Sequence, residues 1–209
     1  MPVALPPRDA PVLVTIDLHR GHLDPGVATL PLPADAAAAL MGRALPAAAA
    51  PRALGVPAVH LVTACRDRAE ILADPYWAAQ SGRPGSTRAA IAEHDLAGMP
   101  GLELMPGLLA DGDVVIDTKK RYDRFVGTDL EFVLWSAGRR TLVAGVNTTS
   151  CVLATAIAAS VPDFAVVALE DLVDSMMGPD AHAAALGILA GSFAFVASSS
   201  EVVAALGGA

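Results

Sequence analysis

The chain has 209 residues and a formal net charge of −8 at pH 7, and this acidity argues against nucleic-acid binding, which needs a basic surface. Hydrophobic residues make up 54 % of the sequence, yet no apolar run reaches the roughly 18–20 residues that span a bilayer, so we expect no membrane segment. Residues 1–7 do not read as a signal peptide, and the two cysteines, Cys65 and Cys151, suit a reducing cytoplasm rather than a disulfide framework.

Short apolar runs alternate with helical segments along the chain. Helices are expected at 35–54, which should kink or break at Pro46 and Pro51, at 129–137 after the N-cap Thr128, at 151–160, and at 179–189. This alternation predicts parallel strands with right-handed crossovers, in an α/β fold of three layers (α/β/α) around a six-stranded parallel sheet. The six strands are expected near residues 12–16, 58–63, 114–117, 141–145, 165–169 and 193–197.

The segment from 66 to 112 departs from this alternation, because it is irregular and rich in glycine, proline and charged residues. Loops of such length are usually functional or disordered. We expect this one to cover the active-site crevice. The sequence has no internal repeat and no linker, so residues 1–209 are predicted to form a single domain.

The most informative stretch runs from Gly145 to Ala156, where an apolar strand passes into a helix of small residues. Cys151 lies at this junction, where free backbone N–H groups and the helix dipole favour a thiolate, the nucleophile of cysteine enzymes. A lone cysteine is more often a small buried hydrophobe, but the strand–turn–helix setting favours catalysis. Cys65 has no such setting and reads as structural, or at most as pocket wall.

Two further strand ends offer partners for this cysteine. Asp17 ends the first apolar run, and Lys119 and Lys120 end the third. Taken alone, the aspartate fits a helix cap or turn, and either lysine fits the surface. In an open parallel sheet, however, the carboxyl ends of the strands line one crevice. An acid, a lysine and a cysteine at that edge form a set of proton acceptor, charge stabiliser and nucleophile.

These three motifs, in this order, resemble the isochorismatase-like cysteine hydrolases, which include nicotinamidases, carbamoylsarcosine amidases, biuret and ureidoacrylate amidohydrolases, and isochorismatases. The resemblance rests on Asp17 after the first strand, on the run 119–130 with its Phe-x-Gly-Thr-x-Leu, and on Gly-Val-x-Thr-x-x-Cys-Val at 145–152. It covers roughly residues 10 to 200. The family's lysine lies six residues before Phe125, which favours Lys119 over Lys120, since neighbours on an extended segment point to opposite faces.

The resemblance implies a sheet order of 3-2-1-4-5-6 and hydrolysis of a carbon–nitrogen bond in a small linear amide or ureide through a thioester. Lys119 would hold Cys151 as thiolate, and Asp17 would act as acid and base. Backbone N–H groups of Asn147 and Cys151 would form the oxyanion hole, beside a cis Val146–Asn147 peptide. It implies a homo-oligomer, a dimer or tetramer, and we expect no cofactor. Two alternatives stay open: vinyl-ether hydrolysis of isochorismate type, which needs no cysteine, and a catalytically silent binding or scaffold protein.

Substrate contacts are predicted for three residues around this site. His19 and His22 stand where the family commonly has Gln and Phe, and His22 is either a hydrogen-bond donor to substrate or a solvated loop histidine. Trp77 lies in the irregular segment and Tyr122 lies near Lys119 in the sequence. Each of these aromatic residues either closes the substrate pocket or packs in the hydrophobic core.

We expect no metal site. Metal-dependent nicotinamidases carry an Asp-x-His and a further histidine after the second strand, and residues 64–70 lack the Asp-x-His. His60 inside a strand and His94 in the irregular segment show no ligand spacing.

Overall fold

Runs of valine, leucine and isoleucine form a parallel sheet in the computed structural model, which describes residues 10–137 and 140–207. Residues 1–7, to which the signal-peptide argument applies, lie outside this range. The strand order is β3-β2-β1-β4-β5-β6, which confirms the predicted fold and order. The strands are β1 (Pro11–Ile16), β2 (Ala58–Thr63), β3 (Val114–Lys119), β4 (Arg140–Val146), β5 (Ala165–Asp174) and β6 (Phe195–Ala197).

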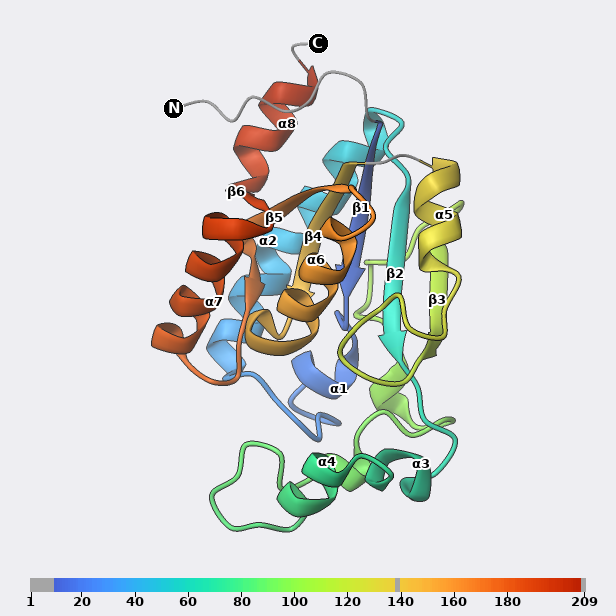
Figure 1. Cartoon of the computed structure of the whole chain (residues 1–209), viewed down its shortest axis with the longest axis vertical. Helices are drawn as coiled ribbons and strands as arrows, with labels where there is room; N and C mark the ends of the chain where they lie inside the picture. The colour runs from blue at the N-terminus through green and yellow to red at the C-terminus, as the bar shows by residue number, and fades with distance from the viewer. Residues whose placement is uncertain (1–9, 138–139, 208–209) are drawn as a thin grey trace.

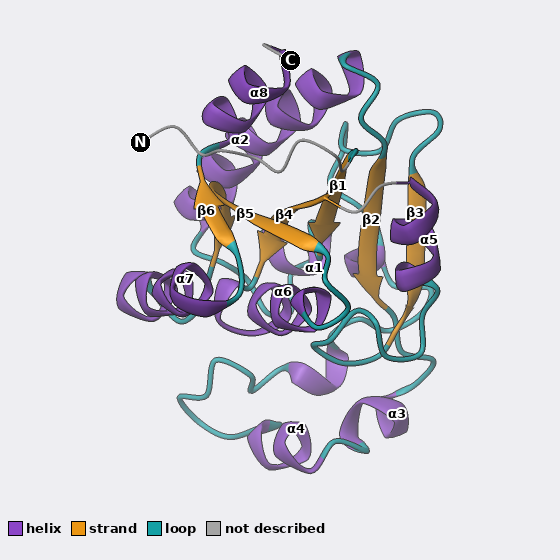
Figure 2. Cartoon of the chain, turned by 45° about the horizontal axis from the view of Figure 1, so that its top comes forward, coloured by secondary structure: helices purple, strands orange, loops and turns teal. Residues whose placement is uncertain are grey.

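Helices cover both faces of this sheet (Figures 1 and 2). On one face, α2 (Ala34–Ala53) and α8 (Ser199–Gly207) pack on a core that includes Leu13, Leu142 and Leu169. On the other, α5 (Leu130–Ala137), α6 (Leu153–Ser160) and α7 (Pro179–Ser192) enclose a second core that includes Val14 and Val143. Alternate side chains of the central strands thus serve the two cores, as a sheet buried on both faces requires. No helix in the described part of the chain is long and apolar enough to cross a membrane.

Helix α2 is not broken at its prolines, contrary to the break considered for Pro46 and Pro51. It runs unbroken from Ala34 to Ala53 with both prolines inside. Each proline removes one backbone N–H donor, and the buried stripe on this helix packs against the sheet on both sides of Pro46, so tertiary packing outweighs the local penalty. That stripe consists of Ala37, Leu40, Met41, Ala44 and Ala48.

Strands β1 and β4 approach closely where the site is built. Gly145 adopts φ +127°, and a Cβ at this position would lie 2.0 Å from the carbonyl oxygen of Ile16. Only glycine fits both the backbone conformation and the contact. This glycine therefore sets how near the segment after β4 lies to Asp17, the residue that follows β1.

The segment 66–112 lies beyond the carboxyl ends of the strands and contains more helix than predicted (Figure 1). Two short helices, α3 (Arg68–Leu72) and α4 (Pro75–Gln80), precede two 3₁₀ turns at Ile91–Glu93 and Pro100–Leu102. Asp67 and Asp74 cap the two helices by accepting hydrogen bonds from Glu70 and Trp77 backbone N–H groups. A small apolar cluster holds the segment together; it includes Leu30, Cys65, Ile71, Trp77 and Ile91.

Candidate active site

A small cavity of about 30 Å³ opens at the carboxyl ends of β1 and β4, the point where the strand order reverses. Asp17, Lys119 and Cys151 all line it. They come from the ends of β1 and β3 and from the turn after β4, so the topology brings together three residues that lie far apart in the sequence. The segment 66–112 contributes further lining residues, among them Trp77 and His94.

Lys119 lies between the other two side chains. Its Nζ is 3.4 Å from Cys151 Sγ and 3.6 Å from Asp17 Oδ2, and it donates a 2.5 Å hydrogen bond to Thr63 Oγ1. All four residues are buried. One ammonium group can therefore stabilise negative charge on either the carboxylate or the sulfur.

Lys120 points elsewhere. Its Nζ donates to the Ala64 carbonyl at 2.5 Å and lies 3.5 Å from Glu70 Oε2, with the side chain 40 % exposed. The structure thus places Lys119 in the cavity and Lys120 at its outer edge.

Arg124 is a second buried cation that the sequence reasoning did not identify. It is fully buried, pairs with Asp17 Oδ2, and donates to Thr63 Oγ1 at 3.0 Å. Thr63 in turn donates to Asp17 Oδ1 through its backbone N–H at 3.1 Å and its hydroxyl at 3.2 Å. In the sequence, only the position of Arg124, one residue before Phe125 of the motif, hints at a role in the site. Arginine is usually a surface residue, so its burial is not expected from the sequence.

The charges of this group determine where its proton lies. Burial favours a raised pKa for Asp17, but Arg124 and Lys119 together bring that pKa well below its ordinary value. Burial raises the pKa of the Cys151 thiol, and Lys119 only partly opposes this. The directions of these two pKa shifts favour a thiol beside a carboxylate at neutral pH, so the role of Lys119 in holding Cys151 as a thiolate stays a prediction.

The local backbone also differs from the expected one at Cys151. The residue does not begin an α-helix; it is the fourth residue of a π-helical turn, Thr148–Val152, and α6 begins only at Leu153. The Val146–Asn147 peptide is cis, as the resemblance implies. Asn147 lines the cavity, and its side-chain oxygen accepts a hydrogen bond from the Met176 N–H at 2.8 Å.

Trp77 and Tyr122 form one wall of the cavity. Trp77 Nε1 donates a 2.6 Å hydrogen bond to Tyr122 Oη, the rings meet edge to face, and the Arg121 guanidinium lies 4.7 Å from the Trp77 ring centre. This bond ties α4 to the segment after β3. Both side chains therefore pack against each other and line the cavity at once.

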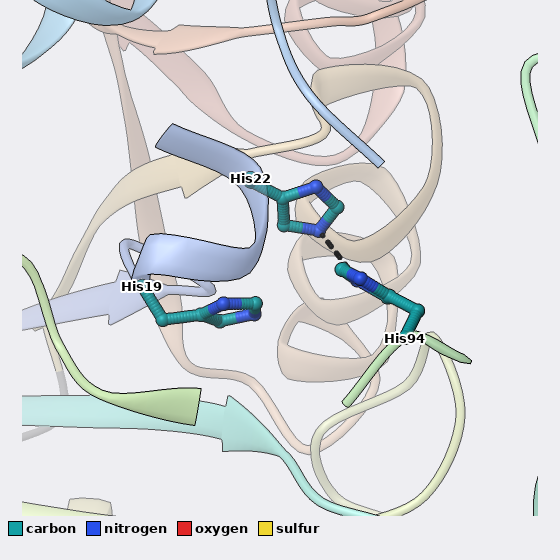
Figure 3. Close-up of side chains that lie close together, drawn as sticks. All are labelled: His19, His22 and His94. Carbon is teal, nitrogen blue, oxygen red and sulfur yellow. Dashed lines mark hydrogen bonds between the residues drawn. The ribbon is translucent and has the colours of Figure 1, made fainter. Parts of the chain in front are cut away.

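Three histidines meet beside this wall, although the sequence spacing suggests no cluster (Figure 3). His19 and His22 come from the first turn after β1 and His94 from the segment 66–112, and one ring nitrogen from each lies within 4.8 Å of the others. All three are buried, so His22 is not a solvated loop histidine. Burial lowers the pKa of His22 to about 3 and that of His94 well below its ordinary value, which keeps both rings neutral.

Asp95 adjoins this cluster. Its Oδ1 lies 3.1 Å from His94 Nε2 and 3.3 Å from His19 Nε2, and burial raises the pKa of its carboxyl to about 7. For His19, burial acts to lower the pKa, but Asp17 and Asp95 outweigh it and the pKa is raised. His60, by contrast, lies apart in β2, where it bonds Thr15 and Asp113.

The sequence profile of the isochorismatase domain matches residues 11–201. The chain belongs to the isochorismatase family. A search of curated proteins finds no match. Many solved structures share its fold, including other isochorismatase-family hydrolases, so the cavity lies in a fold that other hydrolases use.

Three of these structures bear on the site. A putative isochorismatase-family hydrolase from Chromobacterium violaceum is 28 % identical, with a TM-score of 0.72 and full coverage of both chains. A nicotinamidase from Bacillus subtilis is 26 % identical over 90 % of this chain and 99 % of its own, with a TM-score of 0.71. An N-carbamoylsarcosine amidase from Thermoplasma acidophilum is 22 % identical over 90 % of this chain and 96 % of its own, with a TM-score of 0.70, and shows the shared fold.

Proposed function

We propose that this chain is a cysteine-dependent amidohydrolase that cleaves the carbon–nitrogen bond of a small linear amide or ureide. The observation that carries the proposal is the position of Lys119 Nζ, 3.4 Å from the Cys151 sulfur and 3.6 Å from the Asp17 carboxylate, in a buried cavity. The nicotinamidase and the carbamoylsarcosine amidase among the similar structures support the same class of reaction.

The chemistry follows from the resting thiol and carboxylate. Cys151 Sγ attacks the substrate carbonyl carbon while its proton passes to Asp17, and Lys119 stabilises the sulfur as charge develops on it. Backbone N–H groups of Asn147 and Cys151 hold the oxyanion of the tetrahedral intermediate. When that intermediate collapses, the amine leaves with the proton from Asp17, and the acyl group remains on Cys151 as a thioester.

Water completes the cycle. Asp17 accepts a proton from the attacking water, the thioester carbonyl becomes a carboxylic acid, and the proton returns to the departing sulfur of Cys151. The small cavity and its wall of Trp77, Tyr122 and His22 favour a compact substrate. We place these three residues in contact with it.

The test combines a substrate screen with a matched pair of cysteine variants. Small amides and ureides are screened for ammonia release, and the acyl-enzyme is sought by intact-protein mass spectrometry after rapid acid quench. Cys151→Ala should abolish turnover and the mass adduct, whereas Cys65→Ala, which changes the other buried cysteine, should retain both. An active Cys151→Ala variant would rule out the cysteine nucleophile, and no turnover of any amide or ureide by the wild type would favour vinyl-ether hydrolysis or a binding protein.

A further inference from the structure

The hydrolysis just described uses the three-histidine cluster only through His22 at the cavity wall, and no chemical step in it requires the other two histidines. His19, His22 and His94 are packed ring against ring, with centroids 4.5 to 5.7 Å apart (Figure 3). Grouping three buried imidazoles removes their polar nitrogens from water, which is unfavourable unless each nitrogen gains a partner. The partners of the individual nitrogens therefore indicate what the cluster is built to hold.

The Nδ1 atom of each ring is bonded to a neighbouring oxygen. His19 Nδ1 lies 2.8 Å from the Gly101 carbonyl and His22 Nδ1 lies 2.7 Å from the Leu30 carbonyl. A carbonyl only accepts, so His22 Nδ1 carries the proton and its Nε2 keeps a lone pair. His19 Nδ1 lies between the Gly101 carbonyl and the Gly21 backbone N–H, which donates to it at 3.1 Å, so both neighbours fix the orientation of this ring. His94 Nδ1 lies 2.7 Å from Thr29 Oγ1, a hydroxyl that can either donate or accept. Such outer hydrogen bonds are what orient histidine ligands around a metal ion.

Within the described residues, two buried atoms of this group have no hydrogen-bond partner: His19 Nε2 and Asp95 Oδ1. They lie 3.3 Å apart and face each other. The contact between His22 Nε2 and His94 Nε2, at 3.2 Å, accommodates a single proton. A proton there satisfies these two nitrogens but leaves His19 Nε2 with only two carboxylates of the described chain near it, Asp95 Oδ1 at 3.3 Å and Asp17 Oδ1 at 3.6 Å. One metal ion can bind the three imidazoles and Asp95 together once the protons among them are released.

The spacing of these atoms fits ligands of a small divalent ion. Zinc–nitrogen bonds of about 2.0–2.1 Å in a tetrahedral site place neighbouring ligand atoms about 3.3–3.4 Å apart. The separations here are 3.2 Å between the His22 and His94 nitrogens, 3.1 Å from His94 to Asp95 and 3.3 Å from His19 to Asp95. The widest separation among the three histidines, at most 4.8 Å, needs only a small movement of the rings.

We propose that His19, His22 and His94, with the Asp95 carboxylate beside them, bind one divalent transition-metal ion of the zinc class. Imidazole donors favour zinc, cobalt, nickel, copper or iron over magnesium and calcium, which take oxygen ligands. His22, His94 and Asp95 line the same cavity as Cys151, so the ion has a path of entry and a face open to that cavity.

Calorimetry tests this on the full chain after removal of metal by a chelator. Zinc titration should give one ion per chain, cobalt should give the visible absorption of a low-coordinate nitrogen site, and magnesium should not bind. His94→Ala and His22→Phe, which keeps a ring of similar size, should each weaken zinc binding at least ~100-fold, the upper end of what loss of an outer partner causes. Thermal unfolding with chelator present shows whether each variant folds.

His182→Ala is the matched control, because His182 bonds Thr148 outside the cluster and should leave zinc affinity unchanged. Less than one ion per wild-type chain, or zinc binding that both cluster variants retain, would overturn the site. So would a comparable loss in the His182 variant. Calorimetry and cobalt absorption need no substrate, so a failure here leaves the amidohydrolase proposal standing, and a failure of that proposal leaves the metal site standing.

Discussion

Asp17 and Cys151 share one cation, whereas a second cation is bound to Asp17 alone. Lys119 is almost equally distant from the two, so its attraction changes little when negative charge moves from carboxylate to sulfur. Arg124 pairs with the carboxylate and with Thr63, and it favours the charge on Asp17. Thus Lys119 is suited to stabilise the negative charge on whichever of the two groups carries it, and Arg124 to hold the acid in place.

The two adjacent lysines provide a direct test of this reading. Lys119→Met keeps most of the apolar stem and removes the charge, so turnover should fall by at least ~10²-fold, as for loss of a positioned acid–base group. Lys120→Met should change turnover little, because Lys120 is bonded to Ala64 and Glu70 at the outer edge. Steady-state kinetics on any substrate from the screen measures both. If Lys120→Met were inactive and Lys119→Met active, the lysine beside Cys151 would be Lys120 instead of Lys119.

Arg124 should contribute mainly to stability. Arg124→Met leaves the buried Asp17 carboxylate with one cation fewer, so the free energy of unfolding should fall by about 3–5 kcal/mol, as when one partner of a buried ion pair is removed. Urea denaturation at pH 7 measures this. Arg121→Met, in a partly exposed arginine nearby, should change it by less than ~1 kcal/mol.

Adding Asp17→Asn to Arg124→Met should recover part of the lost stability, because the unpaired charge is then absent. If the double variant were as unstable as the sum of the two single variants, the two side chains would not be coupled and the pair assigned here would be wrong.

At the scale of elements, a polar network fastens α2 to the start of β3. Arg52 of α2 donates to Asp113 at 2.5 Å, and His60 Nε2 of β2 lies 3.0 Å from the same carboxylate. The Ala110 N–H also donates to it at 2.8 Å. Burial alone would raise the pKa of Asp113, but these partners outweigh it and the pKa is lowered. The network thus links α2, β2 and the loop that leads into β3 through one carboxylate.

Asp113→Asn should lower the free energy of unfolding at pH 7 by about 1–3 kcal/mol, since it leaves buried donors without their charged acceptor. The native pKa of Asp113 lies below its unfolded value of about 3.9, so its contribution is present above that pH and is lost as the pH falls through the native pKa. The wild type and the variant should therefore differ most at neutral pH and converge in acid. Urea midpoints at pH 7 and pH 3 measure this.

Asp111→Asn is the control for that series, because Asp111 is exposed two residues earlier in the same loop. It should match the wild type at both pH values. If the difference in free energy of unfolding between Asp113→Asn and the wild type stayed constant down to pH 3, the carboxylate charge would contribute nothing to the stabilisation.

At the scale of the whole molecule, stability is distributed unevenly. Two large apolar cores enclose the sheet, whereas the segment 66–112 is held by its own small cluster and by single bonds such as Trp77 to Tyr122. Regions with few buried apolar contacts open locally before the whole fold does. The covering segment should therefore open while the sheet stays intact, which would widen the access of ligands to the cavity beneath it.

Hydrogen exchange followed by mass spectrometry tests this distribution. Peptides from 68–102 should exchange faster than those from β1 and β4, and Trp77→Phe, which removes the bond to Tyr122, should speed exchange in 68–102 while leaving β1 unchanged. If the segment 66–112 and β1 were equally protected from hydrogen exchange, the predicted local opening of the segment would be wrong.

The sequence by itself determined the sheet, because periodic apolar runs and their alternation with helices are local signals. It also located Asp17 and Cys151, because strand ends converge at one edge, and the resemblance to the family motif favoured Lys119 over Lys120. Tertiary structure alone decided the rest. Arg124 lies 107 residues from Asp17, and His94 lies 72 from His22, so no spacing rule finds either contact. The resting thiol of Cys151 likewise follows from burial and from neighbouring charges, which exist only once the chain has folded.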